Sequence, residues 1–165
     1  MTRPVASDPD DIPDDWIHWR QVGHLGIDQT GGLVFPAVAG IPGIYRFLIY
    51  DGDQVVAGYI GQAAKSLAGR FNLYRSRGRK PSTPLDKKTT SRNAVRLIAE
   101  IQAGHAVAVA LIDDRVIFPD GREMILDLAD KVFRSRLERR LILQLAETGI
   151  EVLNRNGNPR WLRES

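Results

Sequence analysis

The sequence contains no cysteine among its 165 residues. Disulfide bonds and metal centres held by cysteine, such as zinc fingers and iron–sulfur clusters, are therefore excluded. Its three histidines (His18, His24 and His105) are scattered and lack the spacing of a metal-binding motif. No apolar run approaches the roughly 20 residues that a transmembrane helix needs. The first residues also lack the apolar core of a signal peptide, so we expect a soluble, cytoplasmic protein without a membrane partner.

Charge is distributed unevenly along the chain, although the formal net charge is only +3. The segment from Asp8 to Asp15 holds five acids and no base. The segment from Arg70 to Arg96 holds nine bases and one acid. Such asymmetry predicts an acidic tail and a surface that faces a polyanion. A solvated surface with an electrostatic bias is the alternative.

The most informative stretch runs from Gly43 to Gly61. It consists of two runs rich in Val, Ile, Leu, Phe and Tyr, which favour strands. The Asp51-Gly52-Asp53 sequence between them predicts a tight turn, because Gly supplies the positive φ that such a turn needs. A hairpin would bring its two ends together, so the triplets Gly43-Ile44-Tyr45 and Tyr59-Ile60-Gly61 are expected side by side.

The rest of the chain predicts a single domain at residues 16–165, preceded by a flexible acidic tail at residues 1–15 that offers little to bury. The segment 76–90 reads as a long basic loop. Residues 106–112 form a continuous apolar run, which predicts a buried third strand. Apolar residues at helical spacing predict helices at three places: after Gly61, over residues 91–103, and from Asp127 to the stop at Gly149.

Other segments are less informative. Trp16 to Trp19 fits a short helix or a strand, and Leu33 to Phe35 fits a short strand. The Pro119-Asp120-Gly121 turn predicts a peripheral hairpin. Residues 16–40 and 113–126 suggest no chemistry.

The two tyrosine triplets, in this order and spacing, resemble the GIY-YIG nuclease family. That family carries an Arg on the helix after the second triplet, a Glu on a later helix and an Asn beyond it. Arg70, Glu138 and Asn154 match these three positions in order. The resemblance covers roughly residues 41–154. It implies a fold of the α+β type, a three-stranded antiparallel sheet flanked by helices, here with an N-terminal extension and the active site on one side of the sheet.

The resemblance also implies phosphodiester hydrolysis that depends on one divalent cation, Mg²⁺ or Mn²⁺. Glu138 would hold the metal, with waters filling the remaining octahedral sites. Arg70 would donate to the non-bridging phosphate oxygens. Tyr45 is the candidate general base, Tyr59 would orient the water or Tyr45, and Asn154 would anchor the Glu138 region.

The role of Tyr45 as general base requires that its surroundings lower its pKa. The unperturbed pKa of tyrosine is near 10, which makes Tyr45 a weak base at neutral pH, so Arg70 or the metal must lower it. We expect Tyr45, Tyr59, Arg70 and Glu138 to converge on one cleft. Placement of Tyr45 and Glu138 on opposite faces of the sheet would contradict this interpretation.

The basic segment is the expected surface for tracking DNA, because neutralised phosphates supply affinity that does not depend on sequence. No base-reading module is recognisable. Many relatives have His four residues after the Arg, where this chain has tyrosine. Monomer and homodimer both remain open. The residues expected to contact substrate are Lys65, Tyr74, Arg75, Arg77, Lys87, Lys88, Arg92 and Arg96.

Each match taken alone also has a structural explanation. Either tyrosine triplet could supply core aromatics, and Asn154 could be a strand-end residue. Glu138 lies among arginines and could form a surface ion pair worth about 0.3–0.5 kcal/mol. For the whole chain, the alternatives are an RNA-directed nuclease in a toxin or defence role, a binding module without catalysis, and an α/β interaction protein with coincidental matches.

Overall fold

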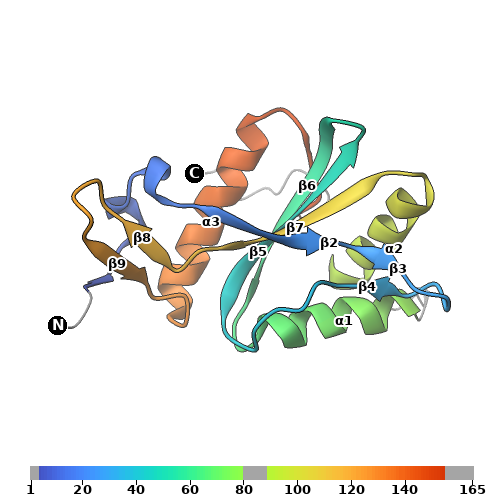
Figure 1. The fold of residues 1–165 in the computed structure, drawn as a ribbon, viewed down its shortest axis with the longest axis horizontal. Coiled ribbons are helices and arrows are strands. Elements are labelled where there is room, and N and C mark those ends of the chain that lie inside the picture. Colours follow the sequence, from blue (N-terminus) through green and yellow to red (C-terminus); the bar gives the residue numbers. More distant parts are fainter. Residues whose placement is uncertain (1–3, 80–88, 155–165) are drawn as a thin grey trace.

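The structure is a computed structural model that describes residues 4–79 and 89–154, with side chains described outside residues 76–91 (Figure 1). The described residues form a mixed fold of several sheets and three α-helices. The central sheet has five strands in the order β10-β6-β5-β7-β2. These strands are β2 (Trp19–His24), β5 (Gly43–Asp51), β6 (Gln54–Ala63), β7 (Ala106–Ile112) and β10 (Glu151–Val152).

The predicted hairpin and third strand form the middle of this sheet. Strands β5 and β6 are antiparallel, and Gly52 at the turn between them has a φ of 60°. Strand β7 pairs with the other side of β5, also antiparallel. The register places Tyr45 opposite Gly61, and Phe47 opposite Tyr59. The two tyrosines therefore lie diagonally across the hairpin on the same face.

The central sheet has two strands more than the three that were predicted. Strand β2 adds to β7 in antiparallel fashion, with a register shift between Gln21 and Gly23. Its sequence does not alternate cleanly between polar and apolar residues, because it lies at a sheet edge and is only partly buried. Strand β10 is two residues long and pairs in parallel with β6. The α+β class is confirmed.

The helices are α1 (Leu67–Arg79), α2 (Thr89–Gln102) and α3 (Lys131–Glu147). Ser66 caps α1, since its hydroxyl accepts a hydrogen bond from the backbone N–H of Gly69 at 3.0 Å. Asp130 caps α3 through the N–H of Phe133. Both ends of the loop predicted at 76–90 are helical, because α1 continues to Arg79 and α2 begins at Thr89.

The N-terminal segment differs from the predicted flexible tail. Strand β1 (Val5–Ala6) pairs with β9 (Glu123–Leu126), which in turn pairs with β8 (Arg115–Ile117) as a peripheral hairpin. Two short 3₁₀ turns follow, Pro9–Asp11 and Asp14–Trp16.

Packing and charge explain why this segment is held. Ile12 is only 1% exposed. The Arg140 guanidinium donates to the carbonyl oxygens of Pro9 and Ile12 at 2.6 and 2.7 Å and pairs with Asp14. Three of the five acids of this segment therefore meet arginines of α3: Asp8 and Asp10 pair with Arg136, and Asp14 pairs with Arg140. A separate two-stranded sheet joins β3 (Gly26–Ile27) to β4 (Leu33–Val34).

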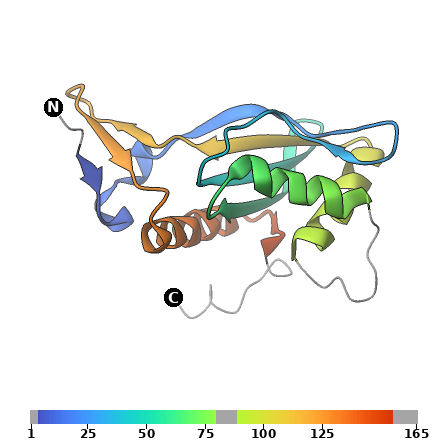
Figure 2. The same cartoon turned by 90° about the horizontal axis from the view of Figure 1, so that it is seen from below.

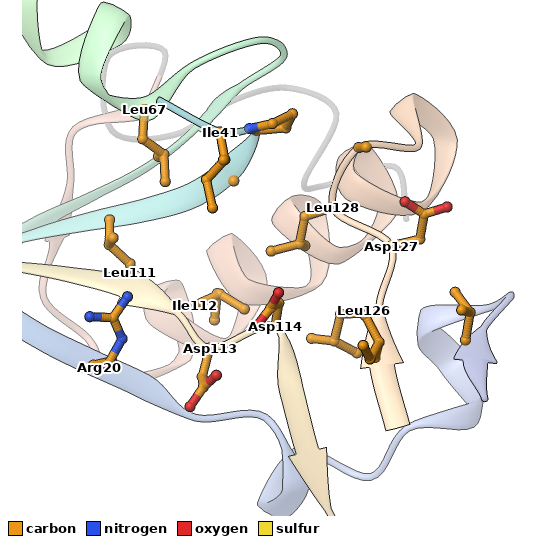
Figure 3. Close-up of a pocket in the computed structure, with 15 residues that line it drawn as sticks. Arg20, Ile41, Leu67, Leu111, Ile112, Asp113, Asp114, Leu126, Asp127 and Leu128 are labelled. Carbon is orange, nitrogen blue, oxygen red and sulfur yellow. The ribbon is translucent and has the colours of Figure 1, made fainter. Parts of the chain in front are cut away.

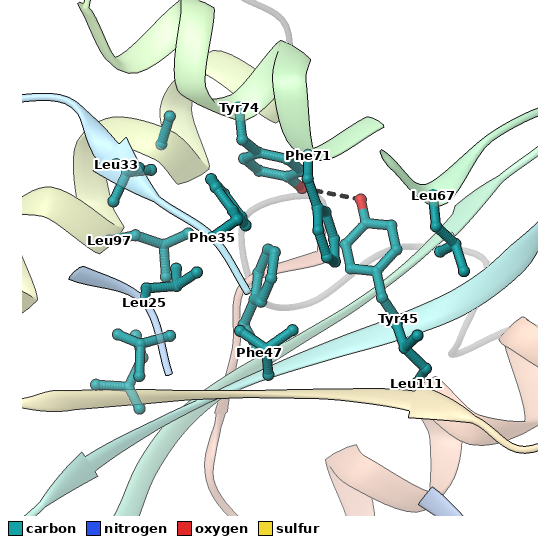
Figure 4. Packing of buried hydrophobic residues seen from close by; sticks show 14 of the residues in the cluster. Leu25, Leu33, Phe35, Tyr45, Phe47, Leu67, Phe71, Tyr74, Leu97 and Leu111 are labelled. Atoms are coloured by element: carbon teal, nitrogen blue, oxygen red, sulfur yellow. Dashed lines mark hydrogen bonds between the residues drawn. The ribbon is translucent and has the colours of Figure 1, made fainter. Parts of the chain in front are cut away.

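The central sheet separates two cores, because neighbouring residues of a strand point to opposite faces. On one face, Tyr45 and Phe47 pack with residues of α1 and α2 (Figure 4). On the other face, Ile44 and Leu48 pack with the apolar stripe of α3, which includes Leu137. Figure 2 shows α1 and α2 together along one part of the sheet and α3 apart from them. The family-like triplets thus contribute to both cores.

Candidate active site

Three tyrosines gather on the face of the sheet that α1 and α2 cover. The hydroxyl oxygens of Tyr45 and Tyr74 are 3.1 Å apart and share a hydrogen bond (Figure 4). The Tyr59 ring lies beside that of Tyr45, with centroids 6.1 Å apart. Phe71 packs edge-on against Tyr45 at 5.3 Å. Strands β5 and β6 supply two of these phenols and α1 the third.

Glycines of both triplets make room for this cluster. A Cβ atom at Gly61 would stand 2.4 Å from the ring carbon Cζ and the hydroxyl oxygen of Tyr45. A Cβ atom at Gly43 would stand 2.7 Å from Cδ1 of Leu67, the first residue of α1. A Cβ atom would fit at either site only if the facing Tyr45 or Leu67 side chain shifted. The second triplet therefore ends in glycine because the first tyrosine lies over it.

Burial controls the ionisation of the inner two tyrosines. Tyr45 is 2% exposed and Tyr74 is not exposed at all. Desolvation raises the pKa of both phenols well above 10. Arg70 lowers the pKa of Tyr45, but less than burial raises it. The sequence argument required a lowered pKa at Tyr45, and Arg70 alone does not produce it; both phenols are neutral at neutral pH.

Tyr59 connects the tyrosines to the charged candidates. Burial raises its pKa first, and the negative charge of Glu138 raises it further. The guanidinium of Arg70 acts in the opposite direction and lowers it. These effects place the Tyr59 hydroxyl within the fields of both Arg70 and Glu138. Tyr59 is also more exposed than Tyr45, so it stands where the cluster approaches the surface.

Glu138 reaches this group from a different direction. Its helix, α3, packs against the sheet face opposite to Tyr45. The side chain is half-buried and lies one residue past Leu137 of the core stripe. The negative charge of Glu138 raises the pKa of Tyr59 on β6. The helix that carries Glu138 thus lies on the face opposite to Tyr45, which does not fit a cleft on one side of the sheet, and the convergence of Tyr45, Tyr59, Arg70 and Glu138 stays a prediction.

Asn154 binds the second triplet. Its side-chain oxygen accepts a hydrogen bond from the Ile60 backbone N–H at 3.2 Å, and its amide donates to the Ile60 carbonyl at 2.7 Å. Asn154 is buried just beyond β10. Through these two bonds the Asn154 side chain extends the contact between β10 and β6 beyond the end of β10. They differ from the predicted anchor for Glu138, since they hold the strand of Tyr59 and not helix α3.

The predicted substrate contacts fall into distinct groups. Lys65 and Arg92 are exposed, and Arg75 is half-buried. Tyr74 is fully buried, so it can act only through Tyr45 and its other neighbours. Arg96 donates two hydrogen bonds to Glu151, at 3.0 and 2.9 Å, and these join α2 to β10. A third goes to Glu100 within α2. The Arg77 side chain, Lys87 and Lys88 lie outside the described residues.

Two polar residues beside the candidate site had no signal in the sequence. Gln62 directly follows the second triplet, and Arg134 lies one helical turn before Glu138. Their side chains bond to each other at 2.6 Å. Arg134 is buried, but in the sequence it is one of several arginines around Glu138 and reads as a surface residue.

The donors available for a metal are few. Within residues 4–79 and 89–154, no group of three or more His, Asp or Glu residues could hold an ion. Glu138 is then a single candidate carboxylate and not part of a ligand cluster among these residues. One carboxylate fits a cation that keeps most of its water, as Mg²⁺ does.

A cavity of about 440 Å³ lies elsewhere in the molecule (Figure 3). It separates the end of β7 from the segment after β9, and its walls include Leu67, Leu111 and Leu128, with Arg20 and Asp113 at its rim. None of the five family-matched residues lines it.

Comparisons with known proteins show the fold. No family model matches the chain, and no curated protein matches it. Among solved structures, the chain is similar to a Glu-to-Ala mutant of EndoII from bacteriophage T4, with a TM-score of 0.50 and 21% sequence identity. The match covers 78% of this chain and 88% of EndoII. Among the described residues, no helix combines the length and apolarity needed to cross a membrane.

Proposed function

We propose that this chain is an endonuclease of the GIY-YIG type that hydrolyses DNA phosphodiester bonds in the cytoplasm. The observation that carries the proposal is the cluster of Tyr45, Tyr59 and Tyr74, in which two hydroxyls share a hydrogen bond, together with the influence of Arg70 and Glu138 on the pKa of Tyr59. The guanidinium of Arg70 would bind a phosphate, the carboxylate of Glu138 would bind a metal ion, and the neutral phenols would orient water between them. The likeness in fold to a phage endonuclease supports the same conclusion.

Arg70 would bind and orient the substrate. It lies in the first turn of α1, half-exposed, and its field reaches both tyrosines of the hairpin. A guanidinium fork matches two non-bridging oxygens of a phosphate and opposes the charge that grows during attack. Lys65 and Arg75, before and within the same helix, would hold the flanking phosphates.

Tyr45 would accept a proton from the attacking water only as the phenolate, after its own proton has passed to solvent. The phenol is neutral in the free protein because burial raises its pKa. When the proton of Tyr45 has left, the Tyr74 hydroxyl can donate its hydrogen to the remaining phenolate oxygen, 3.1 Å away. Tyr59, the more exposed phenol, would orient the water between Arg70 and Glu138.

Glu138 would hold one Mg²⁺ or Mn²⁺ ion, together with water and phosphate oxygens. The bound metal supplies Lewis-acid polarisation of the phosphate and stabilises the leaving oxygen. Asn154 would keep β6 in register through Ile60, so that Tyr59 keeps its place.

This assignment makes a prediction about pH. Below the raised pKa of Tyr45, the phenolate fraction grows about tenfold for each pH unit. Single-turnover cleavage should therefore accelerate from neutral to alkaline pH without a plateau below about pH 9, as long as the protein stays folded. A plateau near neutral pH would contradict a role for a buried tyrosine as the base.

The proposed function is tested by incubation of the purified protein with supercoiled plasmid and, separately, with structured RNA. Each substrate is offered with Mg²⁺, with Mn²⁺ and with EDTA. We expect nicking of the plasmid that requires a divalent ion. Cleavage confined to RNA would replace DNA as the substrate, and binding of either nucleic acid without cleavage under any condition would leave a binding module.

A further inference from the structure

A buried arginine joins helix α3 to the strand of the second tyrosine triplet. Arg134 is 3% exposed. Its Nε donates to Oε1 of Gln62 at 2.6 Å, and its Nη1 donates to the backbone carbonyls of Leu128 and Ala129 at 3.0 and 3.3 Å. The Gln62 amide donates in turn to the Ser135 hydroxyl at 3.4 Å. We call Gln62 and Arg134, with these bonds, the polar clamp.

Holding α3 through a buried arginine carries a desolvation cost that an apolar contact would not. A buried guanidinium loses its hydration, and the oxygens that receive these hydrogen bonds are all neutral. Apolar packing by Leu137 and Leu141 already attaches α3 to the sheet. Apolar contacts tolerate small slides, whereas directed hydrogen bonds to Gln62 and to two carbonyls fix position and rotation.

The clamp lies between the residues that the proposed function uses. Gln62 is three residues past Tyr59 on β6, and Asn154 holds the intervening Ile60. Arg134 and Glu138 are four residues apart on α3, so they share one side of the helix. A shift of α3 along β6 would move the Glu138 carboxylate relative to the Tyr59 hydroxyl by the same distance.

We propose that Gln62 and Arg134 are positioning residues that set where the Glu138 carboxylate stands relative to Tyr59. This inference rests on the proposed function, because it concerns the metal ligand of the same site. Neither residue needs to touch the metal or the substrate. Loss of a bond that orients a metal ligand commonly lowers metal affinity or activity by about 10–100-fold.

The test uses Gln62→Leu, which removes the amide but keeps much of the volume. Gln144→Leu, on α3 and away from the clamp, is the matched control. Mn²⁺ affinity is measured from the spin-resonance signal of free Mn²⁺, and cleavage is measured on the same samples. We expect Gln62→Leu to bind Mn²⁺ about 10–100-fold more weakly and to cleave more slowly by a similar factor, with the control unchanged.

Two further variants separate positioning from stability. Arg134→Lys keeps the charge but loses the fork, and we expect it to weaken Mn²⁺ binding in the same direction. In a Glu138→Ala background, Gln62→Leu should cause no further loss of Mn²⁺ binding or of residual cleavage. The inference is overturned if Gln62→Leu lowers only the urea midpoint, or if its effect persists in full without Glu138.

Failure of the inference can be distinguished from failure of the proposed function. A wild-type protein that cleaves DNA while Gln62→Leu binds Mn²⁺ normally would overturn the clamp alone. A wild-type protein that neither binds Mn²⁺ nor cleaves would overturn both.

Discussion

The two faces of the central sheet are built differently. The face toward α1 and α2 carries rings and hydroxyls, with Tyr45, Tyr59 and Tyr74 grouped around one hydrogen bond. The face toward α3 is aliphatic at its centre, and Ile44 and Leu48 of the same strand lie there. One strand therefore serves both faces. The side with buried hydroxyls has the groups for proton transfer, while the aliphatic side supports the helix that brings the carboxylate.

The basic residues on the two faces also differ, in whether acids of the chain pair with them. Arg136 pairs with Asp10 at 2.7 Å, and Arg140 binds the N-terminal segment through Asp14 and backbone carbonyls. These arginines of α3 are already neutralised within the chain. Lys65, just before α1, and Arg70, in its first turn, form no ion pair with an acid within residues 4–79 and 89–154, and both face the substrate side in our proposal. Basic residues alone do not mark the nucleic-acid surface.

The largest difference in cleavage rate is expected between variants of two arginines, Arg70 and Arg96. Arg70→Ala should slow DNA cleavage by about 100-fold or more, as expected when one charge-stabilising donor is lost from an active site. Arg96→Ala removes a guanidinium that is occupied by Glu151 and Glu100, so cleavage should change less than about threefold. Single-turnover rates with saturating protein give the comparison. Equal losses in the two variants would remove Arg70 from its assigned role.

The tyrosine face can be tested with two glycines. Gly61→Ala forces a Cβ atom to within 2.4 Å of the Tyr45 phenol and should lower the unfolding free energy by about 1–3 kcal/mol. Gly69→Ala adds its Cβ at an exposed helical position, 3.4 Å from Ser66, and should be neutral or stabilising by up to about 1 kcal/mol. Urea unfolding measures both. A stable Gly61→Ala protein with unchanged cleavage would show that the ring is not held over this glycine.

The smallest effect is expected at the acidic segment that covers α3. Asp10→Asn breaks one exposed pair with Arg136 and should lower the unfolding free energy by less than about 1 kcal/mol. The loss should fade at high salt because such pairs are screened. Asp15→Asn, at an exposed neighbouring site, is the control. A loss that persists in full at high salt would contradict an electrostatic role for the segment.

Local patterns in the sequence predicted much of the fold. The Asp-Gly turn, the apolar run at 106–112 and the stripe through Leu137 led to the hairpin, the third strand and α3, as the structure has them. The addition of the edge strands β2 and β10 to the central sheet was not predicted, because neither strand alternates over enough residues. Ile12 is one apolar residue among acids, and its burial depends on α3, which is distant in the sequence.

The candidate site divides in a similar way. The residue types and their order followed from the resemblance of the two triplets, Arg70, Glu138 and Asn154 to a known family. The pKa of Tyr45 was not predictable, because it depends on how completely Phe71 and the sheet bury the ring. Arg134 could not be distinguished from its exposed neighbours, since burial of an arginine is decided by tertiary contacts and not by its own side chain.

The central claim is that Glu138 acts on the chemical step and not on DNA binding or folding. Glu138→Gln keeps the shape of the side chain and removes its charge, and Glu147→Gln changes an exposed carboxylate on the same helix. Single-turnover cleavage with Mg²⁺ and DNA affinity in the presence of EDTA should be measured for both. We predict at least about a 100-fold loss of cleavage for Glu138→Gln, with DNA affinity retained, and no change for Glu147→Gln. Cleavage by Glu138→Gln at the rate of the unaltered protein would contradict the account.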